Sequence, residues 1–136
     1  MTLVNFMKLY LVALPVFFII DMIWLGLIAK GFYQKHLGFL MRPQVNWIPA
    51  ILFYLIFIAG ILIFVVIPAK ADGSAVKAVW LGLIFGLVTY ATYDLTNLAT
   101  VKQWPLVVTV VDITWGMILS ASVGFLTYMI SKALKF

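Results

Sequence analysis

The sequence predicts an all-α integral membrane protein, a four-transmembrane-helix antiparallel bundle with a short interfacial helix between helices 1 and 2. Composition is the first reason, because 66% of the 136 residues are hydrophobic and only 10% are charged. Soluble domains carry about 45–50% apolar and about 25% charged residues. The second reason is that the apolar residues gather in four stretches, each near the ~20 residues that a spanning helix needs. We therefore treat residues 1–136 as a single transmembrane domain.

These stretches place the four helices at about residues 9–29, 48–67, 76–99 and 105–131. The first stretch does not resemble a cleaved signal peptide, because it contains Asp21 and Trp24 and lacks a small-residue cleavage motif. Pro49 and Pro105 fall near helix starts, where a missing N–H does no harm. The polar turn at residues 70–74 separates the second helix from the third, and its aspartate is expected to be solvated.

The connection at residues 30–47 is longer and mixed in character. Its residues Phe32, Tyr33, His36, Leu37 and Leu40 follow helical spacing. We therefore expect a short helix that lies on the membrane surface. Such a helix could act as a lid over whatever lies beneath it.

Charge gives a weak orientation and argues against a nucleic-acid partner. One end of the bundle collects Lys8, Lys70, Lys77, Lys132 and Lys135, and the other collects Lys30, Lys35, Arg42 and Lys102. The positive-inside rule then favours cytoplasmic termini by a small margin. The net charge of +5 is spread over loops rather than gathered in a patch. Lysines that flank membrane helices ordinarily contact lipid headgroups, so the lipid bilayer is the expected partner and nucleic acid is not.

The absence of cysteine and the presence of a single histidine, His36, exclude several kinds of site. Disulfides, iron–sulfur clusters and thiolate metal sites need cysteine, and a zinc site of several imidazoles within one chain needs more histidines. No cofactor is indicated. Any metal would be a hard divalent cation bound by oxygen, with Asp94 and Asp112 as its ligands.

Three aspartates lie inside the predicted helices: Asp21, Asp94 and Asp112. If the helices alternate in direction, a rise of about 1.5 Å per residue places all three roughly 7–13 Å below the same membrane interface. A carboxylate in hydrocarbon is costly, so such residues usually face the bundle interior and mark a site or pathway. We expect the three aspartates to share one layer and one functional site.

Small residues repeat every four positions on the third and fourth helices. The third carries Gly82, Gly86, Tyr90 and Asp94, with Asn97 continuing the stripe, and the fourth carries Asp112, Gly116, Ser120 and Gly124. Residues four apart share a helix face, and small ones let membrane helices approach closely. We expect Gly82 and Gly86 to meet Ser120 and Gly124 near one interface. The bundle would then be closed at that end and form a polar cleft at the other.

Trp24 and Trp115 each follow an aspartate by three residues, which puts each indole on the helix surface of that aspartate. Aromatic faces beside a carboxylate are the usual means of holding an organic cation. The expected ligand-binding or proton-coupling residues are Asp21, Asp94, Asp112, Trp24, Trp115, Tyr90, Tyr93 and Asn97, with Thr96 as a further hydroxyl. At the same end, Lys30, Arg42 and Lys102 would pair with the carboxylates or attract anionic ligands.

Three motifs give the chain a resemblance to a known family. They are Asp21-x-x-Trp24-Leu25-Gly26, then Tyr93-Asp94-Leu95-Thr96-Asn97-Leu98-Ala99-Thr100 with Trp104-Pro105, and finally Asp112-x-x-Trp115-Gly116. In these motifs the chain resembles the small bacterial four-helix membrane proteins catalogued as domain of unknown function 2177. The likeness covers essentially the whole chain. It implies the fold, the topology and a bacterial inner-membrane location, and it carries no activity to transfer.

Three functions fit these residues. The first is binding, and transport, of a small cationic or amphiphilic solute with proton coupling, because crowded carboxylates in a low dielectric cannot all stay ionised. Transport would require a homodimer, since four helices leave little room for alternating access. The second is a membrane-embedded enzyme that uses aspartates as general acid and base on a lipid-like substrate. The third is an accessory subunit in which the polar layer only specifies helix packing.

Overall fold

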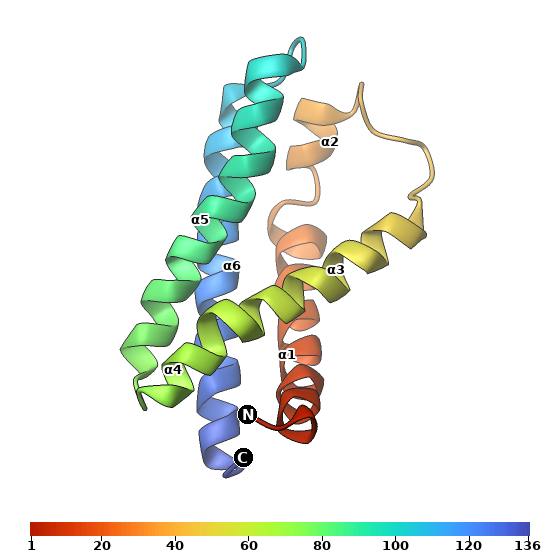
Figure 1. Cartoon of the computed structure of the whole chain (residues 1–136). Helices are drawn as coiled ribbons and strands as arrows, with labels where there is room; N and C mark the ends of the chain where they lie inside the picture. Colours follow the sequence, from red (N-terminus) through yellow and green to blue (C-terminus); the bar gives the residue numbers. More distant parts are fainter.

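Long helices make up nearly all of the computed structural model, which describes residues 1–136 (Figure 1). The first long segment consists of α1 (Leu3–Ile23) and a π-helical turn, Trp24–Ile28, that continues it. The second consists of α3 (Trp47–Ile61), a π-helical turn (Leu62–Val66) and α4 (Ile67–Ala71). Both segments are continuous helices, and in their π-helical turns each backbone hydrogen bond spans one residue more than in an α-helix.

The other two long segments are α5 (Ala75–Thr100) and α6 (Leu106–Ala133). A short helix, α2 (Phe32–Leu37), lies in the connection between the first two segments. Each of the four long segments is long and apolar enough to cross a membrane, with a mean hydropathy between 1.6 and 3.2. The all-α fold and its four helical segments of membrane-spanning length and hydropathy are therefore confirmed.

Capping side chains, rather than the apolar stretches, set the helix starts. The Thr2 hydroxyl accepts a hydrogen bond from the Asn5 backbone N–H at 3.2 Å, so α1 begins earlier than the predicted residue 9. Ser74 does the same for α5 by accepting from the Lys77 N–H at 3.1 Å. A cap satisfies one of the free N–H groups at a helix start. Polar residues that hydropathy excludes, such as Lys8, therefore still belong to the helix.

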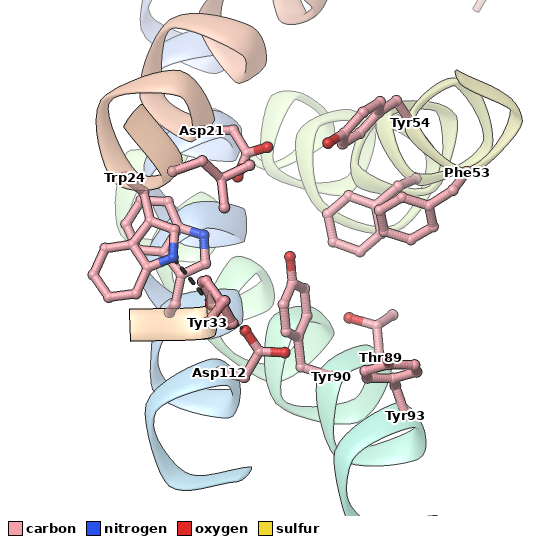
Figure 2. Close-up of a pocket in the computed structure, with 12 residues that line it drawn as sticks. Asp21, Trp24, Tyr33, Phe53, Tyr54, Thr89, Tyr90, Tyr93 and Asp112 are labelled. Carbon is pink, nitrogen blue, oxygen red and sulfur yellow. Dashed lines mark hydrogen bonds between the residues drawn. The ribbon is translucent and has the colours of Figure 1, made fainter. Parts of the chain in front are cut away.

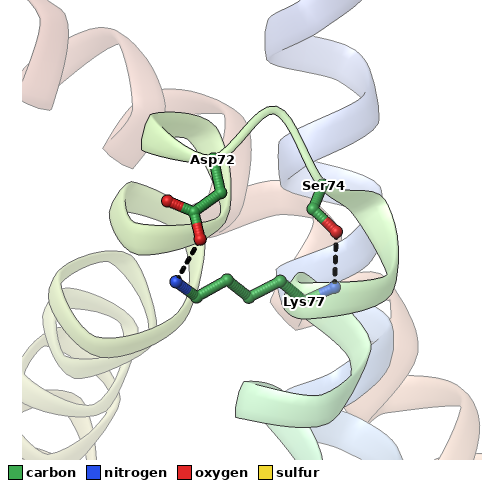
Figure 3. A network of polar contacts seen from close by, with 3 residues as sticks. All are labelled: Asp72, Ser74 and Lys77. Atoms are coloured by element: carbon green, nitrogen blue, oxygen red, sulfur yellow. Dashed lines mark hydrogen bonds and ion pairs between the residues drawn. The ribbon is translucent and has the colours of Figure 1, made fainter.

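The turn between α4 and α5 is polar and exposed (Figure 3). Asp72 forms an ion pair with Lys77 at 2.5 Å, and the Asp72 side chain is 54% exposed. This is the only ion pair in the structure. The fourth aspartate of the chain is thus satisfied locally, apart from the three aspartates inside the helices.

α5 and α6 lie side by side and run in opposite directions (Figure 1). A Cβ atom added to Gly82 would overlap the backbone next to Ser120, and one added to Gly86 would overlap the backbone of Gly116. The two backbones therefore touch at these positions, as small residues allow in membranes.

Gly124 does not take part in this contact in the predicted way. A Cβ atom at Gly124 would meet Val65, from the π-helical turn after α3, and the carbonyl of Ala78. The register of α5 against α6 is thus one turn away from the prediction, which brought Gly82 and Gly86 to Ser120 and Gly124. The reason is that Val65 fills the surface next to Gly124, a contact that a two-helix argument does not include.

The hydrophobic core lies where the second half of α3 packs among α1, α5 and α6. Its almost completely buried members are Leu9, Ala13, Phe17, Ile58, Ile61, Leu62, Val65, Val66, Leu119 and Val123. By contrast, nearly every residue of the first half of α3, residues 47–56, is exposed, and this half diverges from α5 (Figure 1). Both chain ends lie at one end of the molecule, and α2 lies at the other (Figure 1).

The contact between α5 and α6 makes a prediction about stability. Replacing Gly86 by Ala forces the helices apart, and we expect a loss of about 1–3 kcal/mol, the usual cost of overpacking. Thermal unfolding of the purified protein in detergent measures it. The matched control is Gly26→Ala, because a Cβ atom there meets nothing within 4 Å. Equal melting temperatures for both variants would contradict the tight contact.

Candidate functional site

A cavity of about 370 Å³ lies among α1, α3, α5 and α6 and is bordered by α2 (Figure 2). Twelve residues line it, and eight of these are aromatic: Trp24, Tyr33, Phe53, Tyr54, Phe57, Tyr90, Tyr93 and Trp115. The other four are Asp21, Asp112, Thr89 and Leu25. The volume lies within the range of small-molecule sites, about 300–1,000 Å³.

A chain of hydrogen bonds closes the side of the cavity next to α2. The Trp24 indole N–H donates to the Tyr33 oxygen at 3.1 Å, and the Tyr33 hydroxyl donates to Oδ1 of Asp112 at 2.5 Å. Burial and the neighbouring Asp112 carboxylate raise the pKa of Tyr33, so its hydroxyl remains a donor. Tyr33 therefore ties α2 both to the end of the first segment and to α6 (Figure 2).

The two tryptophans stack on each other across the same boundary. Their ring centroids are 4.5 Å apart, and the ring planes differ by only 7°. The Trp115 N–H is buried and makes no hydrogen bond of good geometry, but it lies close to the Asp21 carboxylate. Each indole N–H is thus directed to the aspartate of the other helix: Trp24 reaches Asp112 through Tyr33, and Trp115 approaches Asp21.

Asp21 faces the cavity with two polar neighbours. It is 5% exposed, and the hydroxyl of Tyr54 and the indole N–H of Trp115 both lie close to it. Figure 2 shows Asp21 and the Tyr54 hydroxyl pointing toward each other across the cavity. The Trp115 N–H nevertheless makes no hydrogen bond of good geometry. Asp21 therefore has fewer fixed donors than Asp112.

Asp94 lies behind Asp112 rather than in the cavity wall. It is completely buried, and neither carboxylate oxygen receives a hydrogen bond. The carboxyl of Asp112 lies close to it. Asp112 lines the cavity whereas Asp94 does not, and the charge of Asp112 also acts on Asp21.

The structure brings most of the predicted site residues together and leaves two outside. Asp21, Asp112, Trp24, Trp115, Tyr90 and Tyr93 line the cavity, and Asp94 adjoins it. Asn97 does not line the cavity and lies near Tyr93 instead. Thr96 is also outside, because its hydroxyl donates to the carbonyl of Thr92 on its own helix at 2.5 Å.

The three basic residues expected at this end do not pair with the carboxylates. Lys30, Arg42 and Lys102 are all exposed, and none forms an ion pair. They lie on the connections outside the helices, where a long side chain keeps its charge in water at low cost. No cluster of three or more metal-ligating side chains is present either. The cavity therefore contains carboxylates without a basic partner.

Sequence reasoning missed several residues of the site. Tyr54 could have been found, because it is the only side chain with a polar atom between residues 48 and 67. A tyrosine hydroxyl in such an apolar helix usually has a polar partner. Tyr33 gave no such signal, because its partner Asp112 is 79 positions away. Phe53, Phe57 and Thr89 look like ordinary helix residues in the sequence.

Comparison with known proteins agrees with the fold. A family model described as predicted membrane protein (DUF2177) matches residues 6–129, so the chain belongs to this family. No curated protein and no solved structure matches the chain.

The hydroxyl of Tyr33 is expected to hold α2 in place. Tyr33→Phe removes both hydrogen bonds, and we expect docking of α2 to weaken by about 1–3 kcal/mol. Faster amide hydrogen exchange in residues 32–37 would report it. Tyr128→Phe is the control, because Tyr128 is buried away from α2 and its hydroxyl makes no hydrogen bond. Unchanged exchange in Tyr33→Phe would contradict this role.

The same hydroxyl predicts that docking of α2 weakens in alkaline solution. The pKa of docked Tyr33 is raised, so docking contributes fully below the ordinary tyrosine pKa of about 10 and is lost as pH rises above it. Exchange in α2, corrected for the intrinsic effect of pH, should therefore accelerate in alkaline solution in the wild type. The Tyr33→Phe variant should lack this step.

Proposed function

We propose that this member of the DUF2177 family binds an organic cation in the cavity beside α2 and exchanges it for a proton. The observation that supports the proposal is a cavity with aromatic walls and two carboxylates, Asp21 and Asp112, but no basic side chain. A bound cation would supply the missing positive charge. Its class is a small or amphiphilic ammonium compound.

The charge balance of the site is the first argument. Asp21, Asp94 and Asp112 are close enough for the charge of Asp112 to act on both others. Charges in a low dielectric need a partner, and adjacent carboxylates cannot all be ionised. Without a cation, protons must fill this role, and the neighbouring carboxyls of Asp94 and Asp112 are placed to hold one. An arriving cation would displace that proton.

The aromatic walls favour an organic cation over a metal ion. Hard divalent ions take six or more oxygen ligands, whereas rings dominate this cavity. Ring faces attract ammonium groups by about 0.5–2 kcal/mol each, more when water is excluded. Tyr54 and Tyr90 also point their hydroxyls into the cavity (Figure 2), where they can orient a polar head.

Exchange of a cation for a proton is the elementary step of coupled transport. Transport further requires that the site open alternately to the two sides of the membrane. Four helices provide little structure that can move against a fixed part, so the transporting unit we propose is a homodimer. Binding can be tested without this extension.

The carboxylates are expected to carry the binding. Asp112→Asn or Asp21→Asn should weaken binding of tetramethylammonium about tenfold or more, because a desolvated charge pair is lost. Calorimetry on protein in phosphatidylglycerol nanodiscs measures the affinity. Asp72→Asn, in the exposed turn, is the matched control. A changed melting temperature with unchanged binding would favour a purely structural role for the aspartates.

The affinity should also depend on pH. Protons compete with the cation, so affinity should rise with pH, by up to about tenfold per unit where one proton is exchanged. The titratable groups around Asp112 are Asp21, Asp94, Tyr33, Tyr90 and Tyr93. Asp94→Asn should bind the cation and show a flatter pH profile. An equally steep profile would exclude Asp94 from the proton balance.

A membrane-embedded enzyme is the second candidate, and the approach of the Asp94 and Asp112 carboxyls favours it. Two such groups that share a proton can act as general acid and general base. Turnover of phospholipids by the reconstituted protein, followed by chromatography, tests it. The candidate predicts that Asp94→Asn abolishes turnover. Equal turnover in both proteins would exclude an aspartate mechanism.

A further inference from the structure

The side of the cavity between α3 and α5 differs from the side next to α2. Two lining residues stay largely exposed there: Phe53 of α3 is 47% exposed and Tyr93 of α5 is 57% exposed. Deeper in the molecule the same helices are closed against each other, where Phe57 packs on Phe85 with ring centroids 5.4 Å apart. The cavity is thus open beside Phe53 and Tyr93 and closed below them.

The first half of α3 explains this opening. Most side chains of residues 47–56 are exposed, including Trp47 at 63%, Ile48 at 73% and Ile56 at 70%. α1 contacts this half through Tyr54 and the Leu55 carbonyl, and most of the remaining surface stays exposed, whereas the second half is buried in the core. Since the segment is one of the four that can span a membrane, the exposed side between it and α5 is accessible to lipid.

The route from water, by contrast, is obstructed. α2 carries Tyr33 into the cavity wall, where its two hydrogen bonds connect Trp24 and Asp112. A solute arriving past α2 must break them. A solute arriving from the bilayer meets only apolar and aromatic side chains at the opening, and carboxylates inside.

We propose that the ligand is an amphiphile of the bilayer, whose cationic head occupies the acidic cavity while its hydrocarbon chain extends between Phe53 and Tyr93 into the lipid. This inference rests on the proposed cation binding and adds the ligand class and the access route. On entering the cavity, the cationic head loses the water that surrounded it among the lipid headgroups. In return it contacts aromatic faces and the carboxylates Asp21 and Asp112. The chain never leaves an apolar environment, so its transfer costs little.

Photolabelling in phosphatidylglycerol nanodiscs tests the route. The probe is a long-chain alkyltrimethylammonium with a diazirine on its chain, and the matched control is the alkyl sulfonate with the same chain. Both probes label lipid-facing residues, so the ratio of their labelling isolates what the cationic head adds. We expect this ratio to be raised several-fold at Phe53 and Tyr93. At Ile56, which faces lipid on the same helix but does not line the cavity, it should stay at the background value set by the stronger partitioning of the cationic probe into anionic lipid.

The carboxylate variants separate the two levels of the proposal. Asp112→Asn and Asp21→Asn should lower the labelling ratio at Phe53 and Tyr93 to its background value; this extra labelling by the cationic probe is called the excess below. A high concentration of tetramethylammonium should have the same effect. A carboxylate-dependent excess in residues 32–37, or in the outer groove next to Val110 and Ile118, would overturn the lateral route and leave cation binding intact. So would carboxylate-dependent binding of tetramethylammonium with no excess for the long-chain probe. No excess anywhere, together with no tetramethylammonium binding, would refute the proposed function itself.

Discussion

The backbone contact between α5 and α6 is the constraint on which the rest of the structure depends. With Gly86 against Gly116, the next turn of α5 places the ring of Tyr90 directly over Gly116, where any side chain would collide with it. One turn further, Asp94 arrives next to Asp112. A shift of one helical turn would separate these two carboxyls and push the Tyr90 ring away from the cavity. The packing of small residues therefore fixes the chemistry one and two turns above it.

Burying the carboxyls then requires donors, and other elements of the chain supply them. α6 carries Asp112, but the hydroxyl that bonds to it comes from α2, and the N–H behind that hydroxyl comes from Trp24. Asp94 receives no donor and depends on Asp112 alone. Since a buried polar group without a partner costs several kcal/mol, the carboxyls bind the separate helices into one arrangement. The stacked pair Trp24 and Trp115 adds an aromatic contact across the same boundary.

The sequence predicts the parts of this arrangement that follow from periodicity and fails where distant contacts decide. Four spans, the small-residue faces and the common level of the aspartates all follow from counting along a helix. The register of α5 on α6 does not, because Val65 from a third segment occupies the surface beside Gly124. Nor does the place of Asp94 behind Asp112, which depends on that register. Tyr33 is recognisable as part of a short helix, yet only the folded chain brings it to Asp112. The exposed Lys30, Arg42 and Lys102 illustrate the converse, that opposite charges at the same end of a bundle need not meet.

The position of α2 and the charge at Asp112 are linked by the Tyr33 hydrogen bond. A hydrogen bond to a carboxylate is about twice as strong as one between neutral groups. A cation that neutralises the charge of Asp112 weakens the bond that holds α2 and favours its release. By the same linkage, release of α2 makes Asp112 easier for a cation to neutralise. The Tyr33 oxygen also accepts a hydrogen bond from Trp24, so release of Tyr33 removes a partner from the stacked indole pair as well. The residue that closes the cavity toward water is therefore the one that responds to its charge.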